Sequence, residues 1–325
     1  MAKREASQID RPDALIAPAS TSLRAFRHDE RCRFRSLRGQ GRRVVIRLTY
    51  RCDLACPHCL VGANLYRSEG ELDLAAWSSI LAELDRIQAR KVLLTGGEPL
   101  LHPDLVGITA FVSSAGIPVD LNSNLQKMTP SLIQDLHRAG LTEISVSLEG
   151  PPEVHDRMHG TPGAWAKTVR AIRWAGEKGI QVDAACCVTP DNRPHLDELL
   201  AHVESLPIHS FTVSRMYPIG HGLAHLDRSV PQSELTALYH DLVERWVGRA
   251  RIPIRLVGLL SCPQPSDCER GRSLIGITPR GHVVPCVLAI ENPLGIPHPL
   301  EVGLAQAVEA ANRELDAGAY QMCCP

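Results

Sequence analysis

The chain lacks the segments that would place it in or across a membrane. No apolar run approaches the ~20 residues that a transmembrane helix needs. No apolar stretch follows the charged residues of segment 1–7, as a secretion signal would require. We therefore expect a cytoplasmic protein. In that reducing compartment the 11 cysteines should not form structural disulfides, which favours metal-binding or catalytic roles.

The chain also lacks a strong net charge. The formal value is −1, so the whole molecule is not an evident binder of polyanions, and nucleic acid is not an expected partner. The charge is uneven, because residues 1–43 carry 11 Lys and Arg against 5 Asp and Glu. This basic N-terminal extension has little hydrophobic periodicity. We expect a solvated tail or an arm that binds an acidic peptide.

From residue 44 onward, apolar β-branched runs alternate with amphipathic segments. The expected strands are 44–49, 91–95, 117–121, 143–148, 180–188 and 211–214. The expected helices are 73–89, 105–115, 130–139, 165–178, 195–205 and 231–247. This alternation predicts an α/β fold, a partial (β/α)6 TIM-like barrel over 44–217. An open doubly wound sheet is the alternative, and in both folds ligands bind at the carboxyl ends of the strands.

Three cysteines, Cys52, Cys56 and Cys59, follow the first expected strand with the spacing C-x3-C-x2-C. Thiolates are the preferred ligands of iron–sulfur clusters. Three ligands leave one iron of a [4Fe–4S] cluster open to chelate a substrate, as a catalytic metal site requires. The alternatives are unliganded thiols and a structural zinc site completed by His58. That histidine lies between two ligands and is poorly placed to point inward with them.

This cysteine motif resembles the defining motif of the radical S-adenosylmethionine (radical SAM) superfamily. Residues 95–100, one strand later, resemble its GGEP motif. The resemblance implies that Gly96, Gly97, Glu98 and Pro99 bind S-adenosylmethionine (SAM), with exposed backbone receiving the methionine amino group. It places His58 near the adenine, where the family usually has an aromatic residue. The alternatives are an ordinary turn at 96–99 and a loop histidine without such a contact.

Further segments at expected strand ends resemble the same family. Residues 145–157 resemble an SLDG…HD(R/K) segment, and the sequence departs from the family pattern at Glu149 and, two residues after the segment, at His159. The resemblance implies that Ser147 binds the SAM carboxylate or ribose and that Arg157 pairs with the carboxylate. A salt-bridged residue at a helix start is the alternative for Arg157.

Three other strand ends complete the expected SAM site. Asn122 belongs to a polar segment that faces the site in the family, and Arg215 begins an R-x-x-P-x-G segment. Val188 ends the fifth expected strand and is a candidate for adenine contact, with core packing as the alternative. Cys186 and Cys187 point to opposite faces of that strand and are expected to be small buried hydrophobic residues.

A second cysteine group lies in the last 64 residues. A hairpin with its turn at 279–282 should bring Cys268 and Cys286 together. This stretch resembles the SPASM/Twitch extension of radical SAM enzymes, which implies a small auxiliary-cluster domain over 218–325. Its ligands would be Cys268, Cys286 and one or both of Cys323 and Cys324, with Cys262 as a further candidate. Cys262 or Cys324 is alternatively a thiol that donates hydrogen, and unliganded thiols or a zinc site are further alternatives.

The family resemblance implies reductive cleavage of SAM to a 5′-deoxyadenosyl radical that abstracts a substrate hydrogen. The expected function is modification of a ribosomal peptide or natural-product intermediate by crosslinking, epimerisation or oxidation. A small-molecule aminocyclitol or aminoglycoside dehydrogenase or epimerase is the alternative enzyme. A non-catalytic metal- or nucleic-acid-binding protein is the alternative of another class. A flavodoxin- or ferredoxin-like protein is the expected electron donor.

Overall fold

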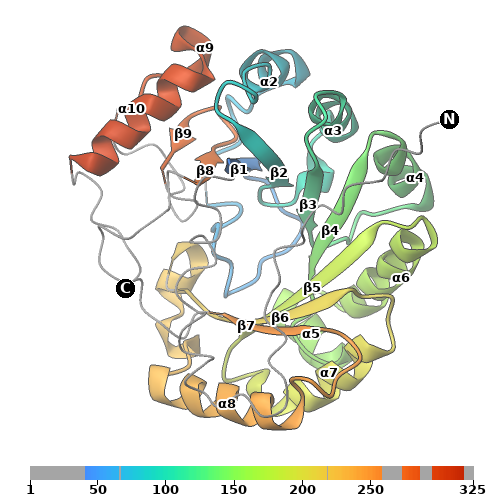
Figure 1. Ribbon diagram of the computed structural model, residues 1–325. Helices are drawn as coiled ribbons and strands as arrows, with labels where there is room; N and C mark the ends of the chain where they lie inside the picture. The colour runs from blue at the N-terminus through green and yellow to red at the C-terminus, as the bar shows by residue number, and fades with distance from the viewer. Residues whose placement is uncertain (1–40, 66, 218, 258–272, 286–294, 318–325) are drawn as a thin grey trace, which may run out of the picture.

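A single curved sheet organises the chain (Figure 1). The computed structural model describes residues 41–65, 67–217, 219–257, 273–285 and 295–317. Its nine strands follow the order β7-β6-β5-β4-β3-β2-β1-β8-β9, and every neighbouring pair is parallel except β8 and β9. The strands are β1 (Arg42–Arg47), β2 (Ala89–Thr95), β3 (Val119–Ser123), β4 (Leu141–Ser147), β5 (Gln181–Val188), β6 (Ser210–Arg215), β7 (Ile254–Val257), β8 (Leu274–Ile277) and β9 (Val283–Val284).

Helices surround the outside of this sheet (Figure 1). They are α2 (Leu74–Leu81), α3 (Leu105–Ser114), α4 (Pro130–Arg138), α5 (Pro152–His159), α6 (Ala164–Glu177), α7 (Leu196–Glu204), α8 (Gln232–Arg245), α9 (Pro299–Val302) and α10 (Leu304–Asp316). The expected α/β fold with parallel βα units is therefore confirmed, and the curved sheet is that of a partial TIM-like barrel. No helix within the described ranges is long and apolar enough to cross a bilayer.

Burial explains why these segments form strands and helices. Along β5, buried and less buried residues alternate, as expected for a strand with one face against the core. Helix α4 begins where Thr129 accepts a hydrogen bond from the Leu132 amide and Pro130 takes the first helical position. One continuous core joins the strands to the helices that cover them.

The first long helix is shorter than the sequence predicts. The expected helix 73–89 begins on schedule, where Asp73 caps α2 by accepting from the Ala76 amide at 2.9 Å. It ends at Leu81, where i→i+3 hydrogen bonds such as that from the Leu84 amide to the Leu81 carbonyl replace the helical pattern, and β2 begins at Ala89, paired with Arg42. The six expected strands are present as β1–β6.

The expected C-terminal hairpin is present as β8 and β9. Its turn at 279–282 is closed by the Thr278 amide, which donates to the His282 carbonyl at 2.9 Å, and Gly281 takes a positive φ of 85° there. Strand β8 pairs in parallel with β1 and so joins the hairpin to the same sheet. The division into an extension, a core and an auxiliary-cluster domain stays a prediction.

Candidate functional site

The parallel sheet gathers the candidate residues at one edge. The turn at 96–99 follows β2, Ser147 ends β4, Val188 ends β5 and Arg215 ends β6. The three-cysteine segment 52–59 follows β1, and we call it the cysteine loop. Because the carboxyl ends of parallel strands meet at one edge, the fold brings these segments to a common site.

The cysteine loop holds three free, partly exposed thiols, Cys52, Cys56 and Cys59. Its first sulfur receives two hydrogen bonds: the Leu54 amide donates to Cys52 Sγ at 3.4 Å, and Asn124 Nδ2 donates to it at 3.8 Å. The Cys59 amide donates to the Cys56 carbonyl at 3.2 Å, which turns the loop back on itself. Donors aimed at sulfur favour its thiolate form, the form that binds metal.

The thiols are close enough to repel one another as anions. Burial raises the pKa of Cys52 to about 12, and the charges of Glu98, Asp53 and Cys59 add to the rise. Burial also raises the pKa of Cys56, again with a contribution from Cys59. A cationic centre would be needed to hold all three sulfurs as thiolates at neutral pH, because metal ligation displaces thiol protons.

Three thiolates in one short loop are a donor set that an iron–sulfur cluster accepts. Across the described ranges, no three His, Cys, Asp or Glu side chains are grouped as ligands of one metal ion would be. A cubane cluster bonds each thiolate to a separate iron, so its ligands need not converge on one point. The expected zinc alternative for this loop therefore gains no support from the geometry.

The turn after β2 lies directly against the chain that enters the cysteine loop. The Gly97 amide donates to the Thr49 carbonyl and the Glu98 amide to the Arg51 carbonyl, both at 2.7 Å. A Cβ on Gly96 would lie 2.7 Å from the Thr49 oxygen, closer than real Cβ atoms approach. Glycine is thus required for this contact between the turn and the loop.

Glu98 ties the turn to the next strand. Its buried carboxylate accepts from Ser123 Oγ at 2.7 Å and from the amides of Asn124 and Leu100 at 2.8 and 2.9 Å. Burial raises the pKa of Glu98 to about 7 in spite of these donors. The side chain points into the protein and fixes the turn, while Pro99 begins a short 3₁₀ helix (Pro99–Leu101) behind it.

His58 of the cysteine loop faces a buried carboxylate at the end of β4. Its Nε2 lies 3.3 Å from Glu149 Oε1, and the two side chains are 11% and 2% exposed. The ring of His159 lies edge-on to His58 at 6.3 Å and stacks on His155 at 4.1 Å. The two positions where the sequence departs from the family pattern, 149 and 159, thus both lie next to His58 of the cysteine loop.

The other expected SAM contacts have different surroundings. Asn122 is exposed and donates to Thr95 Oγ1 at 3.4 Å. Arg215 donates to Gln232 Oε1 at 3.5 Å, and its guanidinium lies over the ring of Tyr217. Ser147 is partly buried, and within the described ranges its hydroxyl makes no hydrogen bond.

Arg157 and Val188 are the two candidates for which the sequence leaves an alternative role open. Arg157 is exposed on α5 and forms no ion pair with any residue that the structure describes, so the salt-bridge alternative gains no support. The Val188 side chain belongs to the hydrophobic core, as the packing alternative expects. Cys186 is fully buried and Cys187 partly buried, on opposite faces of β5.

Sequence reasoning missed three residues that hold the cysteine loop in place. Asn64 accepts from the Cys52 amide at 2.9 Å and donates to its carbonyl at 3.0 Å. Glu71 accepts from the Tyr50 amide at 2.7 Å. His221 contacts the Cys56 carbonyl through Nδ1 at 3.1 Å, and its amide donates to the Cys59 carbonyl. No motif marks them, because each acts on main-chain atoms that any residue would present.

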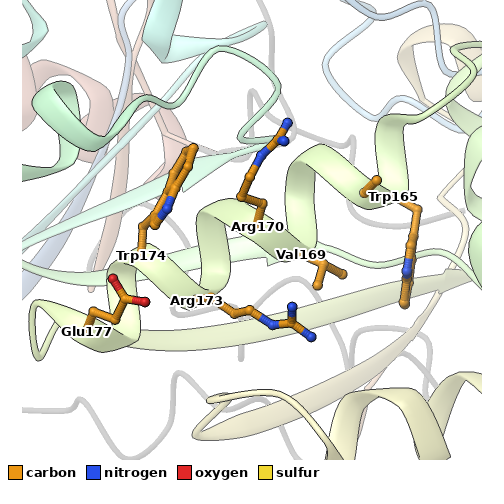
Figure 2. Close-up of a pocket in the computed structure, with 7 residues that line it drawn as sticks. Trp165, Val169, Arg170, Arg173, Trp174 and Glu177 are labelled. Carbon is orange, nitrogen blue, oxygen red and sulfur yellow. The ribbon is translucent and has the colours of Figure 1, made fainter.

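A shallow groove of about 410 Å³ lies along the outer face of α6 (Figure 2). Trp165 and Trp174 line it together with Arg170 and Arg173, and the Arg170 guanidinium lies over the Trp174 ring. The Trp165 ring also lies edge-on to His155 at 5.5 Å. The groove therefore lies on the Trp165 side of His155, and no residue of the cysteine loop lines it.

The second cysteine group lies outside the described residues. Cys262, Cys268, Cys286, Cys323 and Cys324 all fall there, as does segment 1–40. The auxiliary cluster, its ligands, the hydrogen-donating thiol and the acid-binding arm stay predictions.

Comparisons with known proteins identify the family that the chain resembles. The sequence profile of the radical SAM superfamily matches residues 46–203. The chain is 28% identical over 250 residues to the PqqA peptide cyclase of Bradyrhizobium diazoefficiens, covering 75% of this chain and 66% of the relative. It is 29% identical over 255 residues to the mycofactocin maturase MftC of Mycobacterium tuberculosis, covering 75% of this chain and 64% of that protein. The chain thus spans just under two thirds of these relatives.

The fold is similar to that of SuiB from Streptococcus suis. The structure bound to S-adenosylmethionine matches with a TM-score of 0.69 and 15% identity, covering 89% of this chain and 69% of SuiB. The structure bound to the precursor peptide SuiA matches with a TM-score of 0.67 and 16% identity, covering 83% and 67%. At such identities the likeness shows a shared fold.

Proposed function

The chain belongs to the radical SAM superfamily, and we propose that it is an enzyme that reductively cleaves SAM and modifies a ribosomally made peptide. The observation that carries this proposal is the contact between the cysteine loop and the turn at 96–99. The Glu98 amide donates to the Arg51 carbonyl, one residue before Cys52. A ligand of the cysteine loop would therefore lie beside the glycine turn proposed to receive SAM.

Cys52, Cys56 and Cys59 would hold a [4Fe–4S] cluster with one iron left for SAM. When bound and reduced, the cluster supplies one electron to the SAM sulfonium, which gives methionine and a 5′-deoxyadenosyl radical that abstracts a substrate hydrogen. The chain's own contribution is to fix and enclose these groups. Asn64 and Glu71 hold the main chain of the cysteine loop, and Glu98 holds the turn.

The remaining SAM contacts follow from the strand ends. We assign to Ser147, whose hydroxyl has no partner in the described chain, a hydrogen bond to the SAM carboxylate or ribose. Asn122 and Arg215 lie at the same edge of the sheet with exposed or partly exposed polar groups. Arg157 is proposed to pair with the carboxylate, His58 to lie near the adenine, and Val188 to contact it through its main chain.

A peptide substrate is favoured by the relatives. Of the relatives described above, one is named a peptide cyclase and the other a maturase, and SuiB has been crystallised with a precursor peptide. The basic N-terminal extension is suited by its charge to an acidic leader segment. We further propose that a flavodoxin- or ferredoxin-like protein donates the electron and that the C-terminal cysteines hold an auxiliary cluster.

The proposal is tested on anaerobically reconstituted protein. We expect about 8 irons per chain if both clusters form, and formation of 5′-deoxyadenosine from SAM with dithionite. A precursor peptide encoded beside the gene should then change mass on incubation with the enzyme. Zinc without iron, or iron without 5′-deoxyadenosine, would overturn the enzyme assignment.

The net reaction can be read from the product. Epimerisation through a thiol would install one solvent deuterium in D₂O, whereas crosslinking or oxidation would remove hydrogen from the peptide. Turnover of an aminocyclitol with no change in any peptide would favour the small-molecule alternative.

A further inference from the structure

Glu149 occupies a junction between four parts of the chain. Its main-chain amide donates to His155 Nδ1 on α5 at 3.2 Å. Its main-chain oxygen accepts from Asn192 Nδ2 at 2.7 Å. Asn192 is itself fully buried and also donates to the Cys187 carbonyl at 2.9 Å. The backbone of Glu149 is thereby fixed to α5 and to the segment after β5.

The carboxylate of Glu149 completes the junction. Oε2 accepts from the Cys187 amide of β5 at 2.7 Å, and Oε1 lies 3.3 Å from His58 Nε2. Both oxygens are thus engaged in a side chain that is 2% exposed. A buried carboxylate held on two sides has little freedom to move, so its partner His58 is held as well.

His58 transmits this constraint to the cysteine loop. It lies between Cys56 and Cys59, whose main chains form one turn. The opposite end of the loop, at Cys52, is held by Asn64. The contact with Glu149 therefore acts together with His221, which holds the Cys56 and Cys59 carbonyls, on the half of the loop that Asn64 does not reach.

Glu149 also brings charge to the loop. Burial raises the pKa of Glu149, but the facing His58 and the hydrogen bond from the Cys187 amide lower it below its usual value, so the side chain is a carboxylate at neutral pH. This carboxylate contacts His58, which stands between Cys56 and Cys59 in the chain. Net charge around an iron–sulfur cluster is one of the factors that set its reduction potential.

We propose that Glu149 is a positioning residue of the cysteine loop, which holds the Cys56–Cys59 turn through His58 and lowers the reduction potential of the cluster bound there. The inference rests on the proposed cluster at Cys52, Cys56 and Cys59. As an anionic residue beside the loop, Glu149 keeps the bound cluster strongly reducing, as cleavage of a sulfonium requires.

The test compares Glu149→Gln with the wild type and with Glu143→Gln, a control that removes a carboxylate near the opposite end of the same strand, where Glu143 pairs with Lys91. The glutamine keeps the shape and one acceptor but loses the charge. Each protein is reconstituted with iron and sulfide, its iron is counted, and the cluster at the cysteine loop is titrated by electron paramagnetic resonance.

We expect Glu149→Gln to bind iron like the wild type and to titrate at a higher potential. A tenfold change in the ratio of reduced to oxidised cluster corresponds to about 59 mV for one electron. Glu143→Gln should titrate like the wild type. A wild-type potential in Glu149→Gln, or an equal shift in both variants, would overturn the electrostatic role.

The positioning role is read from His58→Phe and His58→Gln. The phenylalanine cannot reach the carboxylate and should lower iron retention at least twofold during gel filtration, whereas the glutamine can donate to Glu149 and should restore it. Equal retention in both variants would overturn this role. If the wild type bound no iron at all, the proposed function would fail instead.

Discussion

A Cβ atom added to Gly97 would lie 2.2 Å from the main-chain oxygen of Arg51, the residue before Cys52. The obstacle is backbone on both sides, since the Arg51 carbonyl carbon and the Tyr50 oxygen lie at 2.7 and 2.8 Å from the same point. The turn after β2 and the start of the cysteine loop therefore approach as closely as a peptide chain permits. Any larger residue at position 97 must push one of them away.

Gly97→Ala should consequently displace the start of the cysteine loop. Overpacking of this kind costs typically about 1–3 kcal/mol, and we expect the free energy of urea unfolding to fall by that amount. Iron content after reconstitution should fall as well. Gly107→Ala in α3 is the control, because its Cβ would meet only the flexible end of Leu74. Full iron in Gly97→Ala would show that the contact is not needed.

Replacing one cysteine of the loop should remove one cluster and leave the rest of the protein intact. Cys56→Ser is expected to lose about four irons per chain and all 5′-deoxyadenosine formation. Cys187→Ser is the matched control: its thiol is outside the loop, and its structural hydrogen bond to Glu149 comes from the main chain. Equal loss of iron in both variants would contradict the assignment of the ligands.

The sequence carried enough information for the order of strands and helices and for the place of the site. Apolar β-branched runs marked β1–β6, and the cysteine triplet and the glycine pair each marked one of the two loops that meet. Both signals are local. The parallel arrangement then brings every strand end to one edge, whatever the loops contain.

Other features depend on contacts between distant residues and have no local signal. Strand β8 pairs with β1 across more than 200 residues. Helix α5 is short and rich in polar residues, so the hydrophobic periodicity of its sequence is weak. The His58–Glu149 pair joins two positions that the sequence analysis treated separately, and only the folded chain shows that they meet.

The buried carboxyl of Glu98 predicts a pH effect on stability. Its folded pKa of about 7 lies above the ordinary 4.5 because of burial. Between these values the folded protein keeps a proton that the unfolded chain has released. The stabilisation of the folded state by protonated Glu98 is therefore complete below pH 4.5 and is lost as the pH rises through 7. Relative to Glu98→Gln, the wild type should lose roughly 3 kcal/mol across that interval. Urea unfolding at pH 5 and pH 7.5 measures the difference, and parallel profiles would contradict it.

The stacked histidines predict the opposite dependence. Burial, with the charge of neighbouring His155, lowers the pKa of His159 from 6.5 to about 3. The unfolded chain therefore takes up a proton between pH 6.5 and 3 that the folded protein refuses. The contribution of His159 to the free energy of unfolding is therefore complete above pH 6.5. It falls by about 1.4 kcal/mol per pH unit as the pH decreases toward 3.

His159→Phe should flatten this part of the profile. Both ring nitrogens of His159 are buried and lack hydrogen-bond partners among the residues that the structure describes, so an apolar ring of similar size loses no bond there. We expect the variant to be at least as stable as the wild type at pH 7 and less sensitive to acid at pH 5. The exposed His209, changed to Phe, is the control and should leave the profile unchanged. Since the unfolded states of the two variants lose the same titrating group, a difference between their profiles can arise only from the folded protein, where burial keeps His159 neutral.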